Sequence, residues 1–416
     1  MGEGQARGLG MRVGASALNY RALRAFGTRL PRWTGGWMPW LGISRYAPPE
    51  LPGPDWVRLR PLLSGICGSD LALITGRSSA VLAPFNSFPA ILGHEVVAVV
   101  EVAGPAAGVA PGQRVVLDPI ISCTVRGLDP CTACRDGLPA LCRRAADGTL
   151  APGMLIGFCR DLPGAWSDAM LAHASQLHLV PAELSDEVAV LVEPLACGMH
   201  AVLREPPADG ERALVIGGGA IGLGTMAALR MVAPGADTTI LVRHPLQGEL
   251  AMRLGAHHVV VDRHGDGARR AAVELAGAAA HRGLIGPPTL TGGFEAVYEC
   301  SGTAASLEAG LRVTAPRGRL AMIGSVARTD HLDLTLAWAR ELRIIGNYVY
   351  GREPSLPGTP HTFDHLLRLL AEHPELPVGE LVTHRFPLER WRDALRVASG
   401  RERHASVKVV FDHRSA

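Results

Sequence analysis

The sequence has almost no excess of charge of either sign. Its 41 Lys and Arg residues oppose 39 Asp and Glu residues, which leaves a net charge of +2 over 416 residues. A chain so nearly neutral has no overall field that would draw it toward nucleic acid or an anionic membrane. We therefore predict neither nucleic acid nor a membrane as a partner.

Long hydrophobic runs are also missing. The longest uncharged apolar stretch covers residues 213–229 and contains five glycines. It is just short of the ~18 residues that a membrane span needs. Its composition instead indicates a strand, a glycine-rich turn and a helix.

Cysteine is sparse and unevenly placed. Eight Cys residues in 416 are too few for a disulfide scaffold, and four of them fall within residues 123–142. This placement indicates metal binding in a reducing compartment, and we expect a cytoplasmic protein. The Arg-rich start of the chain weakly resembles a transit peptide, so organelle targeting stays open as an alternative to a plain N-terminal extension over residues 1–50.

The remaining sequence indicates an α/β protein of two or three domains, at about 150 residues per domain. Residues 55–119 alternate short β-branched runs with Gly and Pro, which is typical of a compact β-rich unit. From residue 185 onward, strand patterns alternate with long helical stretches, which predicts a parallel sheet covered on both faces. The strand candidates are Ala213–Ile216, Thr239–Val242, His258–Val261, Ala296–Glu299 and Arg319–Ile323.

A glycine motif follows the first of these strands. Gly217, Gly219 and Gly222 have the spacing G-x-G-x-x-G, directly before a helical stretch. The first glycine permits a tight turn, the second lets the backbone approach a pyrophosphate, and the third allows close packing of helix and strand. The N–H groups of the following helix, beginning at Ala220 and Ile221, then face the phosphates. The motif predicts a dinucleotide site, with a purely structural glycine turn as the alternative.

The end of the next strand bears on the choice between NAD and NADP. An acidic residue there would accept hydrogen bonds from the adenosine ribose, whereas a basic residue would pair with a 2′-phosphate. No acidic residue occurs between Asp237 and Glu249, and Arg243 is a planar bidentate donor suited to phosphate. We therefore predict a preference for NADP, with a solvated loop arginine as the alternative.

Two further motifs combine metal-ligand side chains. Gly65-Ile-Cys-Gly-Ser-Asp70 and Gly93-His-Glu95 place a thiol and an imidazole on separate loops, with carboxylates beside both, which suits a Zn²⁺ site that keeps a position open. Together with Val192-Glu-Pro-Leu-Ala196, the glycine motif and the cysteine-rich loop, they resemble the zinc-dependent medium-chain dehydrogenase/reductase superfamily. The resemblance is to the branch of sorbitol, threonine and glucose dehydrogenases, and it runs from about residue 55 to the C-terminus.

The resemblance implies a catalytic zinc held by Cys67 and His94. Glu95 or Glu193 would supply a third ligand, directly or through water, and the sequence leaves this choice open. Glu95 alternatively only orients neighbouring groups.

The resemblance also assigns two supporting roles. Ser69 matches the hydroxyl that relays the alcohol proton, with a simple turn residue as the alternative, and Asp70 matches the acid that orients His94. The family often continues the relay to a His shortly after the Asp, but this chain has Leu71-Ala-Leu73 there. The proton must therefore leave through water, the cofactor ribose or another side chain.

The cysteine-rich loop predicts a second, structural zinc. Cys123, Cys131, Cys134 and Cys142 would form a closed tetrahedral site that ties down a loop with little core of its own. The last three match the family's spacing, whereas residues 124–130 look like a local insertion. Unmetallated thiols are the main alternative, and an iron–sulfur cluster is a remote one.

The resemblance implies a GroES-like catalytic domain and a Rossmann domain. Segments around Cys300 and Gly324 resemble the strand ends that line the nicotinamide side. We predict an N-terminal extension at 1–50, a catalytic domain at 51–194 with the zinc lobe at 123–142, a Rossmann domain at 195–347, and a return to the catalytic domain at 348–416.

The expected reaction is reversible hydride transfer between an alcohol, polyol or sugar hydroxyl and NAD(P), with zinc acting as a Lewis acid. The partners would be a small alcohol or carbonyl substrate and further copies of the chain, in a homodimer or homotetramer. Two alternatives remain: a zinc-free, NADPH-dependent reductase of the same fold, and a non-catalytic protein that binds the cofactor.

Overall fold

The chain folds into two compact units, Met1–Glu193 with Val382–Ala416 and Pro194–Leu381. The structure is a computed structural model that describes residues 5–12, 19, 21–22, 40–325, 329 and 332–414. Most of the Arg-rich start lies outside these residues. The second unit extends to Leu381, beyond the expected boundary at residue 347.

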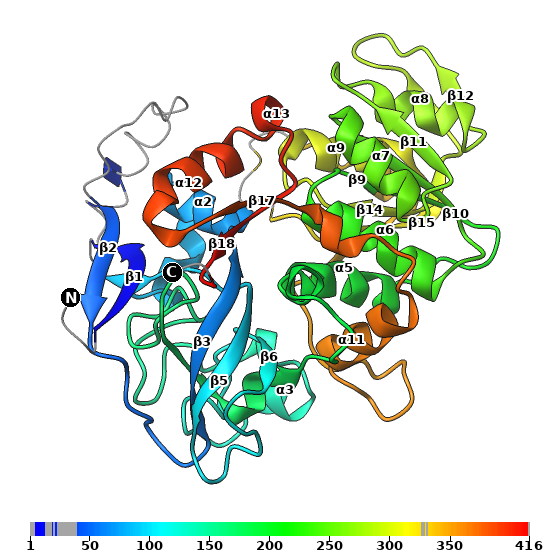
Figure 1. Cartoon of the computed structure of the whole chain (residues 1–416). Helices are drawn as coiled ribbons and strands as arrows, with labels where there is room; N and C mark the ends of the chain where they lie inside the picture. The colour runs from blue at the N-terminus through cyan, green and yellow to red at the C-terminus, as the bar shows by residue number, and fades with distance from the viewer. Residues whose placement is uncertain are drawn as a thin grey trace. The chain divides into compact units, whose positions relative to one another are not determined.

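The first unit is built on a seven-stranded β-sheet (Figure 1). Six strands lie in the order β17-β18-β3-β5-β6-β8, and β7 pairs with β3. The C-terminal strand β18 therefore lies in the middle of a sheet otherwise made mainly from the first half of the chain. The bounds are β3 (Trp56–Gly65), β5 (Val96–Ala103), β6 (Arg114–Leu117), β7 (Met170–His173), β8 (Leu177–Leu179), β17 (Val382–Phe386) and β18 (Lys408–Asp412).

Short helices connect these strands. The α-helices are α2 (Gly68–Ile74), α3 (Thr132–Arg135), α4 (Asp186–Ala189), α12 (Trp391–Ser399) and α13 (Arg401–His404). The 3₁₀ helices are η1 (Ala80–Phe85), η2 (Pro139–Leu141), η3 (Ala174–Gln176) and η5 (Leu388–Arg390).

The segment expected to be an N-terminal extension contributes two strands to the first unit. β1 (Ala6–Met11) pairs with β2 (Leu41–Tyr46) and with β4 (Ala90–Ile91) in a small antiparallel sheet. The N–H of Leu9 donates to the carbonyl of Trp166 at 2.8 Å, and Leu9 is fully buried beside that ring. These parts of residues 1–50 belong to the folded core because their apolar side chains cover Trp166.

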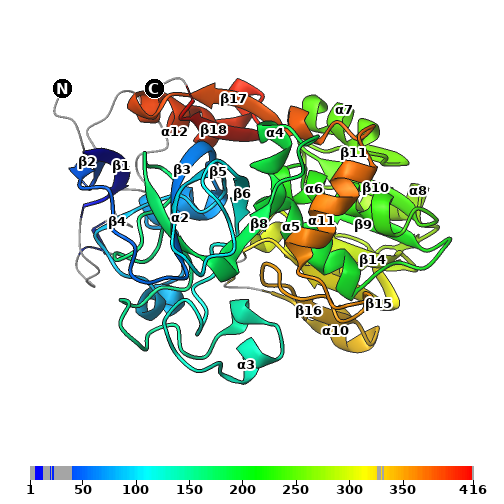
Figure 2. The same ribbon diagram turned by 60° about the horizontal axis from the view of Figure 1, so that its bottom comes forward.

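The second unit has the predicted parallel sheet. Its six strands lie in the order β11-β10-β9-β14-β15-β16, which Figure 2 shows in sequence, and every neighbouring pair is parallel. This is the doubly wound order 3-2-1-4-5-6 of dinucleotide-binding sheets, so the predicted fold class is confirmed. The bounds are β9 (Arg212–Ile216), β10 (Asp237–Val242), β11 (His258–Val261), β14 (Phe294–Glu299), β15 (Thr314–Met322) and β16 (Arg343–Gly346).

Helices cover both faces of this sheet (Figure 1). The two helices α8 and α9 contact each other and pack on Leu214 and Ile216, whereas α6 and α7 contact each other elsewhere on the sheet. A short hairpin, β12 (Ala279–His281) with β13 (Thr289–Thr291), follows α8. The helices are α5 (Val192–Arg204), α6 (Ala220–Val232), α7 (Pro245–Arg253), α8 (Gly267–Glu274), α9 (Ala304–Val313), α10 (Thr335–Ala339), α11 (Thr362–Glu372) and η4 (Val378–Leu381).

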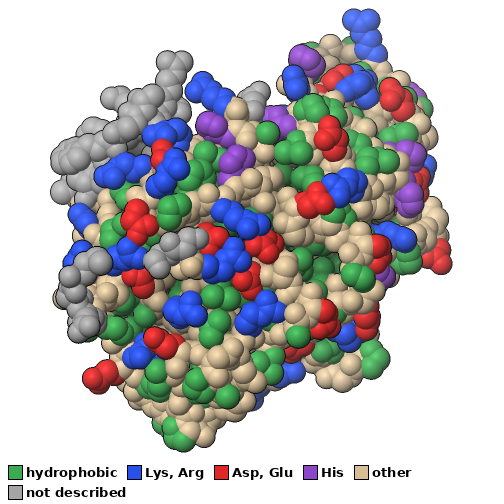
Figure 3. Space-filling model, in the orientation of Figure 1, with side chains coloured by type: hydrophobic (Ala, Val, Ile, Leu, Met, Phe, Trp, Pro, Cys, Tyr) green, Lys and Arg blue, Asp and Glu red, His purple; other side chains and the backbone are tan. Residues whose placement is uncertain are grey.

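Basic and acidic side chains are interspersed over the face seen in Figure 3, in keeping with the small net charge. No described helix is both long and apolar enough to cross a membrane.

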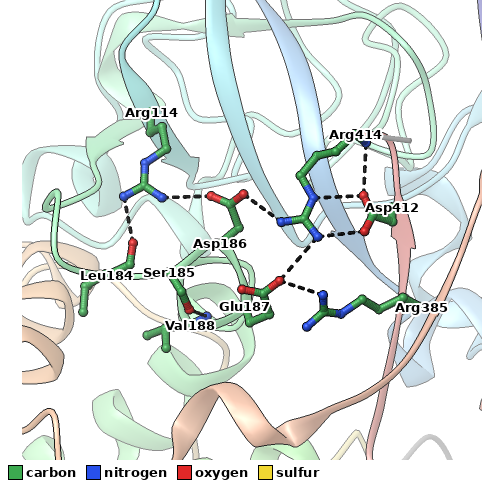
Figure 4. Close-up of polar contacts among 9 residues, drawn as sticks. All are labelled: Arg114, Leu184, Ser185, Asp186, Glu187, Val188, Arg385, Asp412 and Arg414. Carbon is green, nitrogen blue, oxygen red and sulfur yellow. Dashed lines mark hydrogen bonds and ion pairs between the residues drawn. The ribbon is translucent and has the colours of Figure 1, made fainter. Parts of the chain in front are cut away.

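A network of ion pairs attaches α4 to the sheet of the first unit (Figure 4). Asp186 lies 2.8 Å from Arg114 on β6 and 3.1 Å from Arg414, the second residue after β18. Glu187 pairs with Arg385 on β17 at 3.0 Å and with Arg414 at 3.4 Å. Each exposed pair contributes little alone, but a network that shares one arginine fixes the segment leading to the start of α5.

His413, the residue directly after β18, has a titration that should affect stability. Burial lowers the pKa of His413 to about 4, and its Nε2 lies 2.9 Å from the hydroxyl of Ser64. In the unfolded chain the same group titrates near its ordinary pKa of about 6.5. Between these two values the unfolded state binds more protons, so stability falls as the pH falls.

We predict that His413 makes the protein less stable by up to about 3 kcal/mol between pH 6.5 and pH 4. Replacing His413→Gln should remove this part of the pH dependence in urea unfolding, while other titrating groups act alike in both proteins. Identical pH slopes for the two proteins would contradict the assignment.

Candidate metal and dinucleotide sites

Three of the residues expected to bind the catalytic metal converge in the first unit. One ligand atom each from Cys67, His94 and Glu95 lies within 4.8 Å of the other two. Cys67 is the N-cap of α2, and the other two residues directly precede β5. A thiolate, an imidazole and a carboxylate at these separations match a tetrahedral zinc site with one position left for a further ligand.

Two glycines explain why these loops can approach so closely. A Cβ atom on Gly65 would lie 1.8 Å from Oε2 of Glu95, so any side chain would displace that carboxylate. Gly93 has a φ angle of +93°, and a Cβ atom there would lie 2.3 Å from the ring of Trp166. The glycine before His94 is therefore required both by its backbone conformation and by its neighbour.

Asp70 orients the first two ligands. One carboxylate oxygen accepts the N–H of Cys67 at 3.0 Å, and the other lies 3.4 Å from Nδ1 of His94. Burial alone would lower the pKa of His94, but the charges of Asp70 and Cys67 outweigh it and raise the pKa well above its ordinary value. With Nδ1 turned toward Asp70, Nε2 faces the other ligands and lies 3.5 Å from the hydroxyl of Ser69.

A residue that the sequence analysis missed, Lys408, holds Glu95. Its Nζ lies 2.6 Å from both carboxylate oxygens, and both side chains are buried. Burial opposes the charge of Lys408, but Glu95, Cys67 and Glu193 outweigh it and raise the lysine pKa. The signal in the sequence was a lysine directly before the apolar run Val409–Phe411.

Glu193, the other candidate for the third ligand, lies outside the group of three. It is buried in the first turn of α5, and its charge acts on Lys408. Of the two carboxylates left open by the sequence, Glu95 is the one within ligand distance of Cys67 and His94.

The four cysteines of the predicted structural site also come together. One sulfur atom each from Cys123, Cys131, Cys134 and Cys142 lies within 4.8 Å of the others. The N–H groups of Arg143 and Cys134 lower the pKa of Cys131 to about 6, whereas burial raises the pKa of Cys134 and that of Cys142. Four sulfur donors suit a closed zinc site.

The insertion at residues 124–130 has a structural role in this lobe. Its buried Arg126 donates hydrogen bonds to the carbonyls of four residues on the far side of the loop, namely Asp147, Leu150, Ala151 and Gly153. Because the guanidinium is buried, these acceptors replace its lost hydration. Arg126 thus ties the lobe to the segment that follows it, residues 147–153, independently of the cysteines.

Two aromatic residues beside these loops differ in their surroundings. Trp166 is completely buried, donates its indole N–H to the carbonyl of Gly65 at 2.9 Å, and packs against Phe411. It is part of the core. Phe158 lies against the ring of His94, with 5.6 Å between ring centroids.

The glycine motif of the second unit has the geometry of a phosphate-binding turn. Gly217 follows β9 with a φ angle of +116°, and a Cβ atom on Gly222 would lie 1.8 Å from the carbonyl oxygen of Gly217. Gly219 is the N-cap of α6 and has no side chain to occupy the N–H groups of Ala220 and Ile221. This cradle fits a dinucleotide pyrophosphate.

Arg243 lies immediately after β10 and is exposed. Its backbone N–H donates to the side chain of Gln247 at 3.2 Å, and its guanidinium has no hydrogen bond or ion pair with the described residues. Cys300 turns its sulfur toward Thr225 of α6, at 3.5 Å from the hydroxyl. Gly324 packs so tightly on Gly302 that a Cβ atom would lie 2.3 Å from its nitrogen. At these last two positions the backbone, rather than a side chain, can face a cofactor.

Comparison with known proteins agrees with the fold described above. Two family models match the chain: the alcohol dehydrogenase GroES-like domain at residues 53–182 and zinc-binding dehydrogenase at residues 220–372. The erythritol/L-threitol dehydrogenase of Mycolicibacterium smegmatis is 30% identical over 381 residues, which cover 87% of this chain and 91% of that protein. The sorbitol dehydrogenase of Bacillus subtilis is 27% identical over 366 residues, covering 86% and 91%.

Solved structures share the fold. A zinc-binding dehydrogenase from Sinorhizobium meliloti, described as putative and bound to NADP, superposes with a TM-score of 0.71 at 24% identity. The superposition covers 99% of this chain and 100% of that chain.

We predict that Lys408→Met destabilises the zinc-free protein by about 3 kcal/mol, because it leaves the Glu95 carboxylate buried without its partner. Thermal unfolding after chelation measures the loss. Lys408→Arg is the matched control and should retain most of the stability. A Met variant as stable as the wild type would show that the ion pair does not hold Glu95.

Proposed function

The chain belongs to the zinc-dependent medium-chain dehydrogenase/reductase superfamily, and from this premise we propose that Cys67, His94 and Glu95 form its catalytic zinc site. The protein is an NAD(P)-dependent oxidoreductase of the alcohol dehydrogenase type. Its substrate class is alcohols and polyols, with the corresponding aldehydes or ketones in reverse. The convergence of three different ligand atoms within 4.8 Å is the observation that carries the proposed site.

The residues of the first unit can each be given a task. Zinc bound at this site supplies Lewis-acid chemistry, which makes a bound hydroxyl more acidic. Asp70 lies 3.4 Å from Nδ1 of His94, which leaves Nε2 for the metal position. Lys408 balances the charge of Glu95 and limits its movement. The hydroxyl of Ser69, close to the same Nε2, relays the proton of the substrate alcohol: it accepts that proton while it gives its own hydroxyl proton to the next acceptor.

The second unit supplies the cofactor site in this proposal. The backbone at Gly217, Gly219 and Gly222 holds the pyrophosphate, and the first N–H groups of α6 donate to it. A nicotinamide cofactor held by this backbone would supply the hydride-transfer chemistry. The proton leaves Ser69 through water or the cofactor ribose, because residues 71–73 contain no histidine to continue a relay.

Four sulfur donors in the cysteine lobe support a second zinc, so we propose two zinc ions per chain.

All eight cysteines are free thiols in the structure, which supports the cytoplasmic location that we propose. Among the described residues, strand β16 pairs with β15 alone and is mostly exposed, and Trp338 of the preceding helix α10 is 82% exposed. This unpaired edge supports assembly as a homodimer or homotetramer.

A panel of alcohols, polyols and carbonyls with both nicotinamide cofactors tests the function. Ser69→Ala should lower kcat by roughly 100-fold or more without loss of zinc, because it removes the proton acceptor. Ser69→Thr keeps a hydroxyl and should retain activity, which makes it the control. Turnover that is equally fast in the Ala variant, or that survives Cys67→Ser, would favour the zinc-free reductase instead.

We also propose that NADP is preferred over NAD. The exposed guanidinium of Arg243 at the end of β10, with no acidic residue beside it, supports pairing with a 2′-phosphate.

Arg243→Asp should weaken NADPH binding by about tenfold or more relative to NADH, because it exchanges an attractive charge for a repulsive one. Dissociation constants for both cofactors, measured by fluorescence titration, give the ratio directly. Arg282→Asp, the same change of charge at an exposed position between β12 and β13, serves as the control. A ratio that Arg243→Asp leaves unchanged would refute the NADP assignment.

A further inference from the structure

The last residue of β14, Glu299, is a completely buried acid that none of the site motifs includes. It lies on a central strand, between β9 and β15, at the carboxyl end where the glycine turn also emerges. A buried carboxyl group needs hydrogen bonds to replace its hydration. The partners of Glu299 therefore reveal what it holds.

The side chain of Glu299 organises the loop that follows its own strand. One carboxyl oxygen, Oε1, accepts the N–H of Ser301 at 2.8 Å and the N–H of Gly302 at 2.9 Å. Two adjacent donors on one acceptor close a tight turn directly after the strand. The conformation of this turn thus depends on the position of one side-chain atom.

The main chain of the same residue organises the neighbouring loop. The carbonyl oxygen of Glu299 accepts the N–H of Ile323 at 2.9 Å and that of Gly324 at 2.8 Å. These residues follow β15. One residue therefore anchors the loops at the ends of two adjacent strands.

The second carboxyl oxygen, Oε2, is packed between these loops. No donor among the described residues meets it with hydrogen-bond geometry. A Cβ atom on Gly324 would lie only 2.9 Å from it, so this atom fills the space that a side chain at 324 would need. Burial raises the pKa of Glu299, against the opposing effect of Ser306 and of the Ser301 and Gly302 N–H groups. A neutral carboxyl group tolerates this dry position better than a carboxylate.

The turn that Glu299 holds lies directly against the glycine motif. A Cβ atom on Gly217 would lie 3.2 Å from the nitrogen of Ser301, and the N–H of Cys300 donates to the carbonyl of Ile216 at 3.0 Å. A shift of the turn at 301–302 would therefore move the backbone that the first glycine of the motif packs on.

We propose that Glu299 is a positioning residue for the dinucleotide, acting through the backbone of Ser301, Gly302 and Gly324 without touching the cofactor. This inference rests on the proposed dinucleotide site of the second unit. It assigns to a buried acid the task of setting the distance between the glycine turn and the loops after β14 and β15. The carboxyl group is needed for its shape and its acceptor atom, and not for its charge.

The same strand offers a matched control. Glu295 is a partly buried acid on β14, four residues before Glu299. Its carboxylate forms an ion pair with the guanidinium of Arg212 and accepts the backbone N–H of Arg212 at 2.9 Å. It lies toward the opposite end of the strand from the glycine turn. Loss of Glu295 should lower stability without altering the cofactor loops.

The test compares dissociation constants for NADPH and NADH, measured by fluorescence titration of the zinc-loaded protein. Glu299→Ala should weaken the binding of the favoured cofactor about tenfold, because two hydrogen bonds to the turn are lost. Glu299→Gln keeps the acceptor and the shape and should bind within about twofold of the wild type. Glu295→Gln should bind like the wild type even where its melting temperature is lower.

Gly324→Ala gives a second measurement should the Ala variant at 299 fail to fold, because its methyl group would collide with the nitrogen of Gly302 at 2.3 Å and with Oε2 at 2.9 Å, and so would disturb the contact between the two loops directly. It should also weaken cofactor binding, with unchanged zinc content. Wild-type affinity in both Glu299→Ala and Gly324→Ala, or an equal loss in Glu295→Gln, would overturn the inference. A wild-type protein that binds neither cofactor would instead refute the proposed function.

Discussion

The buried ion pair between Lys408 and Glu95 is the contact on which the first unit depends. It joins the C-terminal strand to a loop 313 residues earlier in the sequence, at 2.6 Å and out of contact with water. Neither charge could remain buried alone, because deleting one partner of a buried ion pair lowers the stability by about 3 to 5 kcal/mol. The pair therefore fixes β18 beside β3 and, at the same time, fixes the carboxylate that borders the metal ligands.

The balance of charge around this pair supports the zinc that we propose there. Asp70, Glu95 and Glu193 are all buried, Cys67 adds a thiol, and Lys408 lies beside them. The charge of Lys408 faces Glu95, and Asp70 lies 3.4 Å from His94. A divalent cation held by Cys67, His94 and Glu95 would add positive charge where several acidic groups are buried in a region of low dielectric.

The fold was predictable from the sequence to a large extent. The five strands inferred from alternating patterns all occur in the parallel sheet. His258–Val261 has the predicted bounds, the other four differ by one to five residues at an end, and the short edge strand β16 was not foreseen. Strands with long apolar runs and glycine turns leave a clear pattern. The contribution of residues 6–11 and 41–46 to the first unit was not visible, because it depends on pairing with β4 and on covering Trp166 far along the chain.

The candidate site was predictable only as a set of residue types. The family resemblance implied Cys67, His94 and the two possible carboxylates, and the spacing of the cysteines indicated the four residues of the lobe. Lys408 and Glu299 escaped because their importance comes from tertiary contacts and from burial. A lone charged residue inside a strand pattern is the one local sign of such a role, and it does not name the partner.

Zinc per chain, measured by elemental analysis on wild type, Cys67→Ser and Cys159→Ser, tests the central claim most directly. We expect about two zinc ions in the wild type, about one in Cys67→Ser, and about two in the control, whose buried thiol lies outside both ligand groups. One zinc in all three proteins would mean that only the cysteine lobe is metallated. That result would contradict the catalytic zinc site and the mechanism built on it.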